Sequence, residues 1–238
     1  MTTARALSVN ASAHPSGDRR HWWVLVLVVG TYGDAMPADQ PEAAADLESE
    51  KARLRGSILA ARRARSADDR LIARRAISTH LQAFLQEPAT IAGYLPLPTE
   101  PLDRQFLDDL AGTHRVLVPV VAGAAPLDWC EHPGPTRRGA FGIDEPTGPR
   151  LGETAVADID VFLLPALAVD RLGHRLGRGG GHYDRTLALR GRLRGSTRTG
   201  PLIAVLYDEE FLDAVPVDYF DQPVSEIVTP MRGVLPIS

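Results

Sequence analysis

The sequence is short of cysteine, of lysine and of long apolar runs, and each shortage narrows the possible classes of protein. Cys130 is its one cysteine, so no internal disulfide can form, which fits a reducing compartment such as the cytoplasm. One cysteine among seven scattered histidines also gives no zinc-ligand spacing. No apolar run approaches the ~20 residues that a membrane helix needs, so we expect no contact with a membrane.

Lysine is nearly missing, because Lys51 is the only one beside 25 arginines. A lysine that persists against such a bias is a candidate for a chemical role, although chance retention is the simpler alternative. The net charge of −4 argues weakly against a general nucleic-acid binder. The 238 residues, 44% hydrophobic and 24% charged, suit a globular protein with one sizeable core or two small lobes.

Residues 1–45 differ in composition from the rest of the chain. Basic residues precede the apolar run Val24–Val29, which resembles a secretory signal but lies at the short end of the signal range. The Ala-, Asp- and Pro-rich stretch Asp34–Asp46 is typical of a linker. We therefore predict a poorly ordered extension over residues 1–45, in which Val24–Val29 could add an edge strand. One compact domain is expected over residues 46–238.

The glycine-rich stretch Asp170–Arg185 is the most informative part of the chain. A buried strand candidate, Ile159–Leu164, precedes it, and a helical pattern over Tyr183–Arg190 follows it. A glycine loop that leads into a helix N-terminus can bind anions through its N–H groups and the helix dipole. The stretch therefore predicts a phosphate-binding loop.

Charged residues in and beside the loop support this interpretation. Arg175 and Arg178 can donate forked hydrogen bonds to phosphate oxygens, and Asp184 can hold a divalent cation. The loop is not a Walker loop, because His182 and Tyr183 stand where that motif needs a Lys-Ser/Thr pair, and it lacks the dinucleotide spacing of glycines. A glycine-rich surface loop that binds nothing is the alternative.

Two segments, Leu163–Asp170 and Gly173–Arg185, resemble the signature of the 5-formyltetrahydrofolate cyclo-ligase family, also called methenyltetrahydrofolate synthetase. The resemblance extends from about Ser49 to about Pro230. It implies a three-layer α/β fold with a mostly parallel central sheet. It also implies a ligase of one-carbon metabolism that uses ATP and Mg2+.

The apolar pattern outside the signature predicts the same α/β class. A helix is expected over Ser66–Gln86, with an apolar stripe formed by Leu71, Ile72, Ile77, Leu81, Phe84 and Leu85. Strands are expected over residues 90–95, 115–121, 127–131 and 202–207, a short helix over 102–110, and a flexible basic loop over 191–200. Strands alternating with helices indicate a mostly parallel sheet.

The helix expected over Ser49–Arg65 carries two cations on one face, Lys51 and Arg55, four residues apart. A second face holds its apolar residues, which are Leu54, Ile58 and Leu59. A shared anion would offset the repulsion between the cations, and a solvated basic face is the alternative. The family begins with a Lys-x-x-x-Arg pair that contacts ATP phosphates, and this pair matches it.

The resemblance assigns the other roles residue by residue. It implies ATP contacts at Lys51, Arg55, Arg175, Leu176, Gly177, Arg178, Gly179, Gly180, Gly181, His182 and Tyr183. It implies contacts with the folate substrate at Leu95, Glu100, Arg178, Gly179, Gly180, Gly181 and His182. Arg178 and Tyr183 are the catalytic candidates, and Asp184 and Asp221 are the candidate ligands of Mg2+.

The chain departs from the family pattern at three positions. His182 stands where the family usually has the first of two tyrosines. Phe220 replaces a histidine, and Ser225 replaces an acidic residue. These changes predict a modified site rather than an inactive one. Trp129 and Phe141 could line a ring-shaped pocket, with a position in the core as the default alternative.

The implied reaction closes the ring of 5-formyltetrahydrofolate to give 5,10-methenyltetrahydrofolate, with release of ADP and phosphate. Its partners would be these small molecules alone, with no nucleic acid and no membrane, and we expect a monomer. Two other classes stay open from the residues themselves. One is a different ATP-using transferase on the same sheet, and the other is a non-catalytic nucleotide or RNA binder.

Overall fold

The computed structural model describes residues 41–139, 144–194 and 200–237. Most of the expected extension, including Val24–Val29, lies outside these residues, as do Phe141 and residues 195–199 of the expected basic loop. The described part of the chain holds a central sheet, a smaller sheet and a two-stranded ribbon. The ribbon pairs β4 (Thr136–Arg138) with β5 (Asp144–Pro146).

The central sheet has seven strands in the order β12-β11-β9-β6-β1-β2-β3. Their bounds are β1 Thr90–Ala92, β2 Arg115–Val120, β3 Asp128–His132, β6 Val161–Pro165, β9 Leu202–Val205, β11 Glu226–Thr229 and β12 Gly233–Pro236. Neighbours pair in parallel, except for the edge strands β3 and β12, which pair antiparallel with β2 and β11. The mostly parallel sheet is therefore confirmed.

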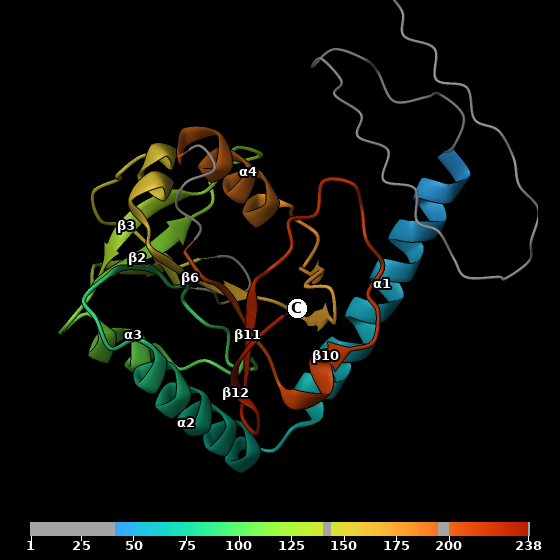
Figure 1. Cartoon of the computed structure of the whole chain (residues 1–238), viewed down its shortest axis with the longest axis horizontal. Helices are drawn as coiled ribbons and strands as arrows, with labels where there is room; N and C mark the ends of the chain where they lie inside the picture. The colour runs from blue at the N-terminus through green and yellow to red at the C-terminus, as the bar shows by residue number, and fades with distance from the viewer. Residues whose placement is uncertain (1–40, 140–143, 195–199, 238) are drawn as a thin grey trace, which may run out of the picture. The chain divides into compact units, whose positions relative to one another are not determined.

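Helices cover both faces of this sheet, which gives three layers (Figure 1). On one face, Ile77 of α2 (Ala67–Phe84) and Phe106 of α3 (Arg104–Leu110) pack with strand residues such as Leu163. On the other face, α4 (His182–Arg194) and the short helix η2 (Glu153–Asp158) pack with the alternate strand residues. Side chains of one strand point alternately to the two faces, so both faces of β6 are buried.

The helix α1 (Pro41–Ala64) packs against the smaller sheet instead. That sheet has the order β10-β7-β8, with β7 at Ala168–Asp170, β8 at Arg175–Leu176 and β10 at Phe211–Leu212. The predicted apolar face of α1 contacts its buried residues, through Leu54, Ile58 and Leu59. The first helix thus lies beside the strand that leads into the glycine loop.

Three local predictions need correction. The first helix begins at Pro41 rather than Ser49, because the Ala and Glu residues of the expected linker favour a helix. The last helix continues through Arg194, so the first part of the expected basic loop is helical. On α2 the buried line is Ala73, Ile77 and Leu81, one turn apart each, which leaves Leu71, Ile72 and Phe84 exposed.

The strands β1, β6 and β9 are parallel, so their carboxyl ends lie at the same edge of the central sheet. Tyr94 follows β1, Ala166 follows β6 and Tyr207 follows β9, and all three residues are buried. Ligand sites of open α/β sheets gather at this edge. Among the described residues, no helix has the length and the apolar character needed to cross a membrane.

Candidate active site

The glycine loop connects β8 to α4 with a backbone that only glycine adopts readily. Gly179 has φ +101° and Gly181 has φ +62°, both in the left-handed region. The loop then enters α4 at His182, so a glycine loop before a helix N-terminus is confirmed. The preceding strand is β8 of the smaller sheet, whereas the buried strand β6 reaches the loop only through β7 and β8.

A close backbone approach fixes the signature against the closing segment of the chain. Gly173 has φ +83°, and a Cβ there would lie 2.4 Å from the carbonyl oxygen of Val224. The Val224 N–H donates to the Gly173 carbonyl at 2.9 Å. Since backbone atoms on both sides leave no room, a side chain at position 173 would push these segments apart.

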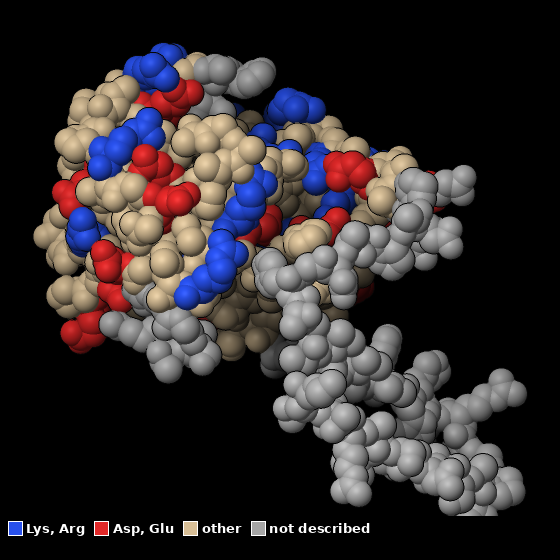
Figure 2. All heavy atoms as spheres, turned by 90° about the horizontal axis from the view of Figure 1, so that it is seen from above, with Lys and Arg blue, Asp and Glu red and all other residues tan. Residues whose placement is uncertain are grey.

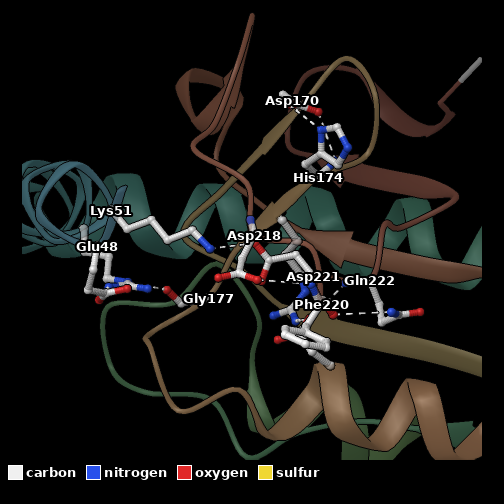
Figure 3. Close-up of polar contacts among 12 residues, drawn as sticks. Glu48, Lys51, Asp170, His174, Gly177, Asp218, Phe220, Asp221 and Gln222 are labelled. Atoms are coloured by element: carbon white, nitrogen blue, oxygen red, sulfur yellow. Dashed lines mark hydrogen bonds and ion pairs between the residues drawn. The ribbon is translucent and has the colours of Figure 1, made fainter. Parts of the chain in front are cut away.

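Lys51 and Arg55 of α1 contact the closing segment and the glycine loop, respectively (Figure 3). The Lys51 Nζ lies 2.6 Å from Asp221 Oδ2, and the Lys51 side chain is 9% exposed. Arg55 donates from Nε to the Gly177 carbonyl at 3.0 Å and from Nη1 to Glu48 Oε1 at 2.6 Å. Lys51 is therefore not part of a solvated basic face, and Arg55 lies against the glycine loop.

Arg175 occupies a buried position behind the loop rather than an open one. Its Nη2 donates to Asp184 Oδ1 at 2.9 Å, and its Nη1 donates to the Pro165 carbonyl at 3.3 Å. The guanidinium carbon lies 5.6 Å from the centre of the Tyr183 ring. Two of its nitrogens thus bind protein groups, so phosphate would have to share or displace these contacts.

The two candidate metal ligands, Asp184 and Asp221, lie next to each other. The backbone N–H of Gln222 donates to Asp184 Oδ1 at 3.2 Å, so the residue after Asp221 contacts Asp184 directly. On Asp221, the Oδ2 atom accepts from Lys51 and from the Asp218 N–H at 2.8 Å. Asp184 thus accepts from Arg175 and Gln222 through Oδ1 alone. Asp221 likewise accepts from Lys51 and Asp218 through Oδ2 alone.

This donor set fits Mg2+ in its chemistry. Mg2+ is usually bound by one or two carboxylates together with phosphate oxygens and water. The side chains of Asp184 and Asp221 are 19% and 20% exposed, so both carboxylates are accessible beside the loop. Among the described residues, no three His, Cys, Asp or Glu side chains form a metal-binding group. A metal here would therefore depend on ligands from phosphate.

On the other side of the loop, Glu100 is buried at 5% exposure and held from two directions. Its Oε2 accepts from the Leu97 N–H at 2.8 Å, and its Oε1 accepts from Arg178 Nη2 at 3.3 Å. Leu95 packs against the core cluster that contains α2 and α3. The structure thus brings Glu100 and Arg178 together, as the predicted substrate-binding set requires.

The first turn of α4 is tied to the loop after β2. His182 donates from Nε2 to the Gly123 carbonyl at 3.1 Å, because a carbonyl oxygen can only accept. The Thr186 hydroxyl donates to the His182 carbonyl at 2.7 Å and accepts from the Leu127 N–H at 2.8 Å. These contacts hold the helix N-terminus, and with it the glycine loop, against the central sheet.

The geometry matches a known family. The sequence profile described as the 5-formyltetrahydrofolate cyclo-ligase family matches residues 47–230. The chain belongs to this family. A 5-formyltetrahydrofolate cyclo-ligase from Mycolicibacterium smegmatis is 40% identical over 153 residues, which cover 61% of this chain and 76% of that protein.

Solved structures of the cyclo-ligase family share the fold. The NMR structure of 5,10-methenyltetrahydrofolate synthetase from Aquifex aeolicus is similar with a TM-score of 0.62 and 27% identity. That comparison covers 79% of this chain and 92% of the other. The enzyme of the same name from Mycoplasma pneumoniae gives a TM-score of 0.59 at 25% identity, with 76% and 99% covered.

The departures from the cyclo-ligase pattern have different surroundings. Ser225 accepts from the Leu202 N–H at 2.9 Å and donates to Glu226, so it joins β9 to β11. Phe220 is 65% exposed, and its ring packs edge-on against Tyr219 with 5.3 Å between centres. Serine at position 225 thus has a structural contact, whereas phenylalanine at position 220 is open to solvent.

Sequence reasoning missed several backbone groups of this cyclo-ligase site. The N–H groups of Asp218 and Gln222 and the carbonyl of Gly177 hold the charged side chains, and backbone groups carry no sequence signal. Glu48 binds Arg55, but in the sequence it is only one of several acidic residues near the start of the first helix. Trp129 is fully buried against Phe162, so the core alternative is confirmed for it.

Proposed function

We propose that this site performs the reaction of its family, the ATP-dependent conversion of 5-formyltetrahydrofolate to 5,10-methenyltetrahydrofolate with release of ADP and phosphate. One observation carries the proposal: Lys51 and Arg55 reach the closing segment and the glycine loop, respectively, from the first helix. Cations, loop N–H groups and a helix N-terminus then surround one position for a polyphosphate.

In this proposal the phosphates of ATP lie against residues 175–183, with the N–H groups of Gly179, Gly180 and Gly181 as donors. Lys51 exchanges Asp221 for a phosphate oxygen, and Arg55 exchanges Glu48, whose side chain is 66% exposed. Each exchange replaces one anion by another, so neither cation is left uncompensated. The N-terminus of α4 adds a favourable dipole for the bound anion.

Asp184 and Asp221 would hold Mg2+ at the same position. The ion supplies positive charge to the phosphate oxygens during transfer. Asp184 already aligns Arg175 through Oδ1, which leaves Oδ2 in a position to serve the ion. Two accessible carboxylates beside a loop suited to phosphate support this assignment.

The chemistry needs no protein nucleophile. Transfer of the γ-phosphoryl group to the formyl oxygen turns a poor leaving group into a good one, after which N10 attacks the activated carbon and phosphate departs. The protein aligns two ligands and stabilises charge. We assign this role to Arg178, which bridges the loop to Glu100, and in the proposal Glu100 and Leu95 bind the folate.

Tyr183 completes the proposed set as a neutral donor. Burial raises the pKa of its hydroxyl, and the nearby Arg175 guanidinium only partly opposes this effect. The phenol therefore keeps its proton at neutral pH. A protonated phenol can donate a hydrogen bond to a phosphate or formyl oxygen, but it cannot act as a general base.

The test mixes the protein, Mg-ATP and 5-formyltetrahydrofolate and follows the near-ultraviolet absorbance of the methenyl product together with ADP release. We expect both signals to depend on folate. Folate-independent ADP release would indicate a different ATP-using transferase. On the face drawn in Figure 2, basic side chains are interspersed with acidic ones, which does not favour a nucleic-acid surface there.

We also propose the setting of this enzyme. The catalytic domain begins with α1 at Pro41, because the expected start at residue 46 falls inside this helix, and the family match covers residues 47–230 of it. We propose that the enzyme acts as a monomer. The single cysteine, buried and free, supports a cytoplasmic location. Sedimentation equilibrium of the purified protein tests the oligomeric state.

A further inference from the structure

A buried tyrosine hydroxyl lies at the edge of the central sheet where the site is built. Tyr94 follows the central strand β1 by two residues and directly precedes Leu95. The residue is 4% exposed, and its hydroxyl has no hydrogen-bond partner among the described residues. Its ring packs in the core cluster with α2 and α3, so the hydroxyl is the one polar atom of a side chain that is otherwise well packed.

A second unpartnered hydroxyl belongs to the same region. The hydroxyl of Tyr183, in the first turn of α4, is also buried without a partner among the described residues. Burial raises the pKa of both phenols, and the negative charge of Glu100 raises both further. The Tyr183 hydroxyl adds a smaller contribution that also raises the pKa of Tyr94. Both phenols are therefore protonated donors at neutral pH.

Two unsatisfied donors in one buried region are unusual, because nearly all buried polar groups in native proteins have a partner. Each unmade hydrogen bond destabilises the ligand-free protein, because the buried donor has lost its contact with water. Phenylalanine would fill the same space at position 94 without this cost. Tyr207, which occupies the corresponding place after β9, shows the usual arrangement, since its hydroxyl donates to the Thr99 carbonyl at 3.2 Å.

We propose that Tyr94 is a further substrate-binding residue, whose hydroxyl donates to a carbonyl oxygen or ring nitrogen of the reduced pterin. This proposal rests on the function proposed above. Among the described residues no group accepts from this hydroxyl, and that includes Glu100, whose oxygens accept from the Leu97 N–H and from Arg178. A flat heterocycle with acceptors along its edge supplies that acceptor, whereas the triphosphate of ATP is proposed to lie on the glycine loop.

The test is Tyr94→Phe, which removes the hydroxyl and leaves the packing. We expect the KM for 5-formyltetrahydrofolate to rise about tenfold and the KM for ATP to change less than about twofold, as for one lost hydrogen bond to substrate. The melting temperature of the ligand-free variant should equal or exceed that of the wild type. The stabilisation that folate gives in a thermal-shift assay should decrease.

Tyr207→Phe is the matched control, because its hydroxyl has a protein partner. We expect this control to lower the ligand-free melting temperature, unlike Tyr94→Phe. A wild-type folate KM in Tyr94→Phe, or a melting temperature that falls as in the control, would overturn the proposal and indicate a buried water as the partner. If the wild type itself forms no methenyl product, the proposed function fails as well.

Discussion

Two ion pairs of α1, one in the middle of the helix and one in its last turn, have the same N–O distance but different surroundings. Arg62 Nε lies 2.6 Å from Glu210 Oε1, and Lys51 Nζ lies 2.6 Å from Asp221 Oδ2. The side chains of Arg62 and Glu210 are 2% and 3% exposed, whereas those of Lys51 and Asp221 are 9% and 20% exposed. About three helical turns separate the two cations on similar faces of the helix.

The surroundings of each ion pair indicate its role better than its N–O distance does. Arg62 also donates from Nη2 to Glu210 Oε2 and to the Ala166 carbonyl, both at 2.7 Å, and Oε2 accepts the Tyr207 N–H at 2.9 Å. All of these partners are protein groups fixed in the fold. Lys51 has one carboxylate partner beside the glycine loop, so a phosphate can replace it.

The largest effect should follow from removing the buried cation. Arg62→Ala leaves Glu210 charged and unpaired inside the protein, so we expect a loss of about 3–5 kcal/mol in the free energy of unfolding. Urea denaturation measures this free energy of unfolding. The control is Arg137→Ala, whose partner is Glu145 and whose side chain is 73% exposed. A change of about 1 kcal/mol or less for both variants would show that the buried pair is not structural.

Asp184→Asn tests the open part of the site. The substitution removes the anion but keeps an acceptor for Arg175, so we expect a small decrease in melting temperature and a loss of cyclisation of at least ~100-fold. Excess Mg2+ should restore part of the activity if metal affinity is the defect. The control is Asp213→Asn, whose side chain is 89% exposed. Normal turnover by folded Asp184→Asn protein would remove the proposed metal role.

Lys51→Ala and Arg55→Ala should each weaken ATP binding about tenfold to a hundredfold, because each removes one charge-assisted contact with phosphate. The affinity for 5-formyltetrahydrofolate should change much less. Isothermal titration with a non-hydrolysable ATP analogue measures both. Arg53→Ala, at an exposed position of the same helix, controls for the loss of one positive charge. Equal ATP affinities in all three variants would contradict the phosphate role.

The smallest effect concerns Asp170, a carboxylate as enclosed as Glu210. Burial alone would raise its pKa, but hydrogen bonds from the His174 side chain and from backbone N–H groups prevail and hold the pKa below its ordinary value. The charged form therefore stabilises the fold above pH ~4, and this contribution is lost as the pH falls through the lowered pKa.

Asp170→Asn should therefore lower the free energy of unfolding by about 1 kcal/mol at pH 7. The difference from wild type should shrink as the pH falls from ~4 through the lowered pKa, below which the wild-type carboxylate is also neutral. Urea denaturation at a series of pH values measures it. A difference that stays constant down to pH ~3 would show that shape, rather than charge, makes Asp170 stabilising.

The sequence predicts the local features of this molecule well. The glycine loop before a helix N-terminus and the alternation of strands and helices are visible in it, because backbone freedom and apolar period are properties of short segments. The family resemblance adds Lys51, Arg55 and Glu100, which lie beside the loop or contact its residues in the structure.

Features that depend on contacts between residues far apart in the sequence cannot be predicted from the sequence. Arg62 and Glu210 are 148 positions apart, so the sequence does not indicate that these two residues pair. Only the packing partner decides which residues of an apolar stripe are buried, and the exposed Leu71 of α2 shows this. The position of Arg175 behind the loop depends in the same way on where β8 pairs.

The contact between Lys51 and Asp221 joins residues 170 positions apart. The ribosome must therefore have synthesised the chain past Asp221 before the site can close, long after it has made the first helix. Termination between the end of α4 and Asp221 would yield a protein with a complete glycine loop but no closing carboxylate. Such a product would lack one of the two proposed ligands of Mg2+, so activity would report on synthesis past residue 221.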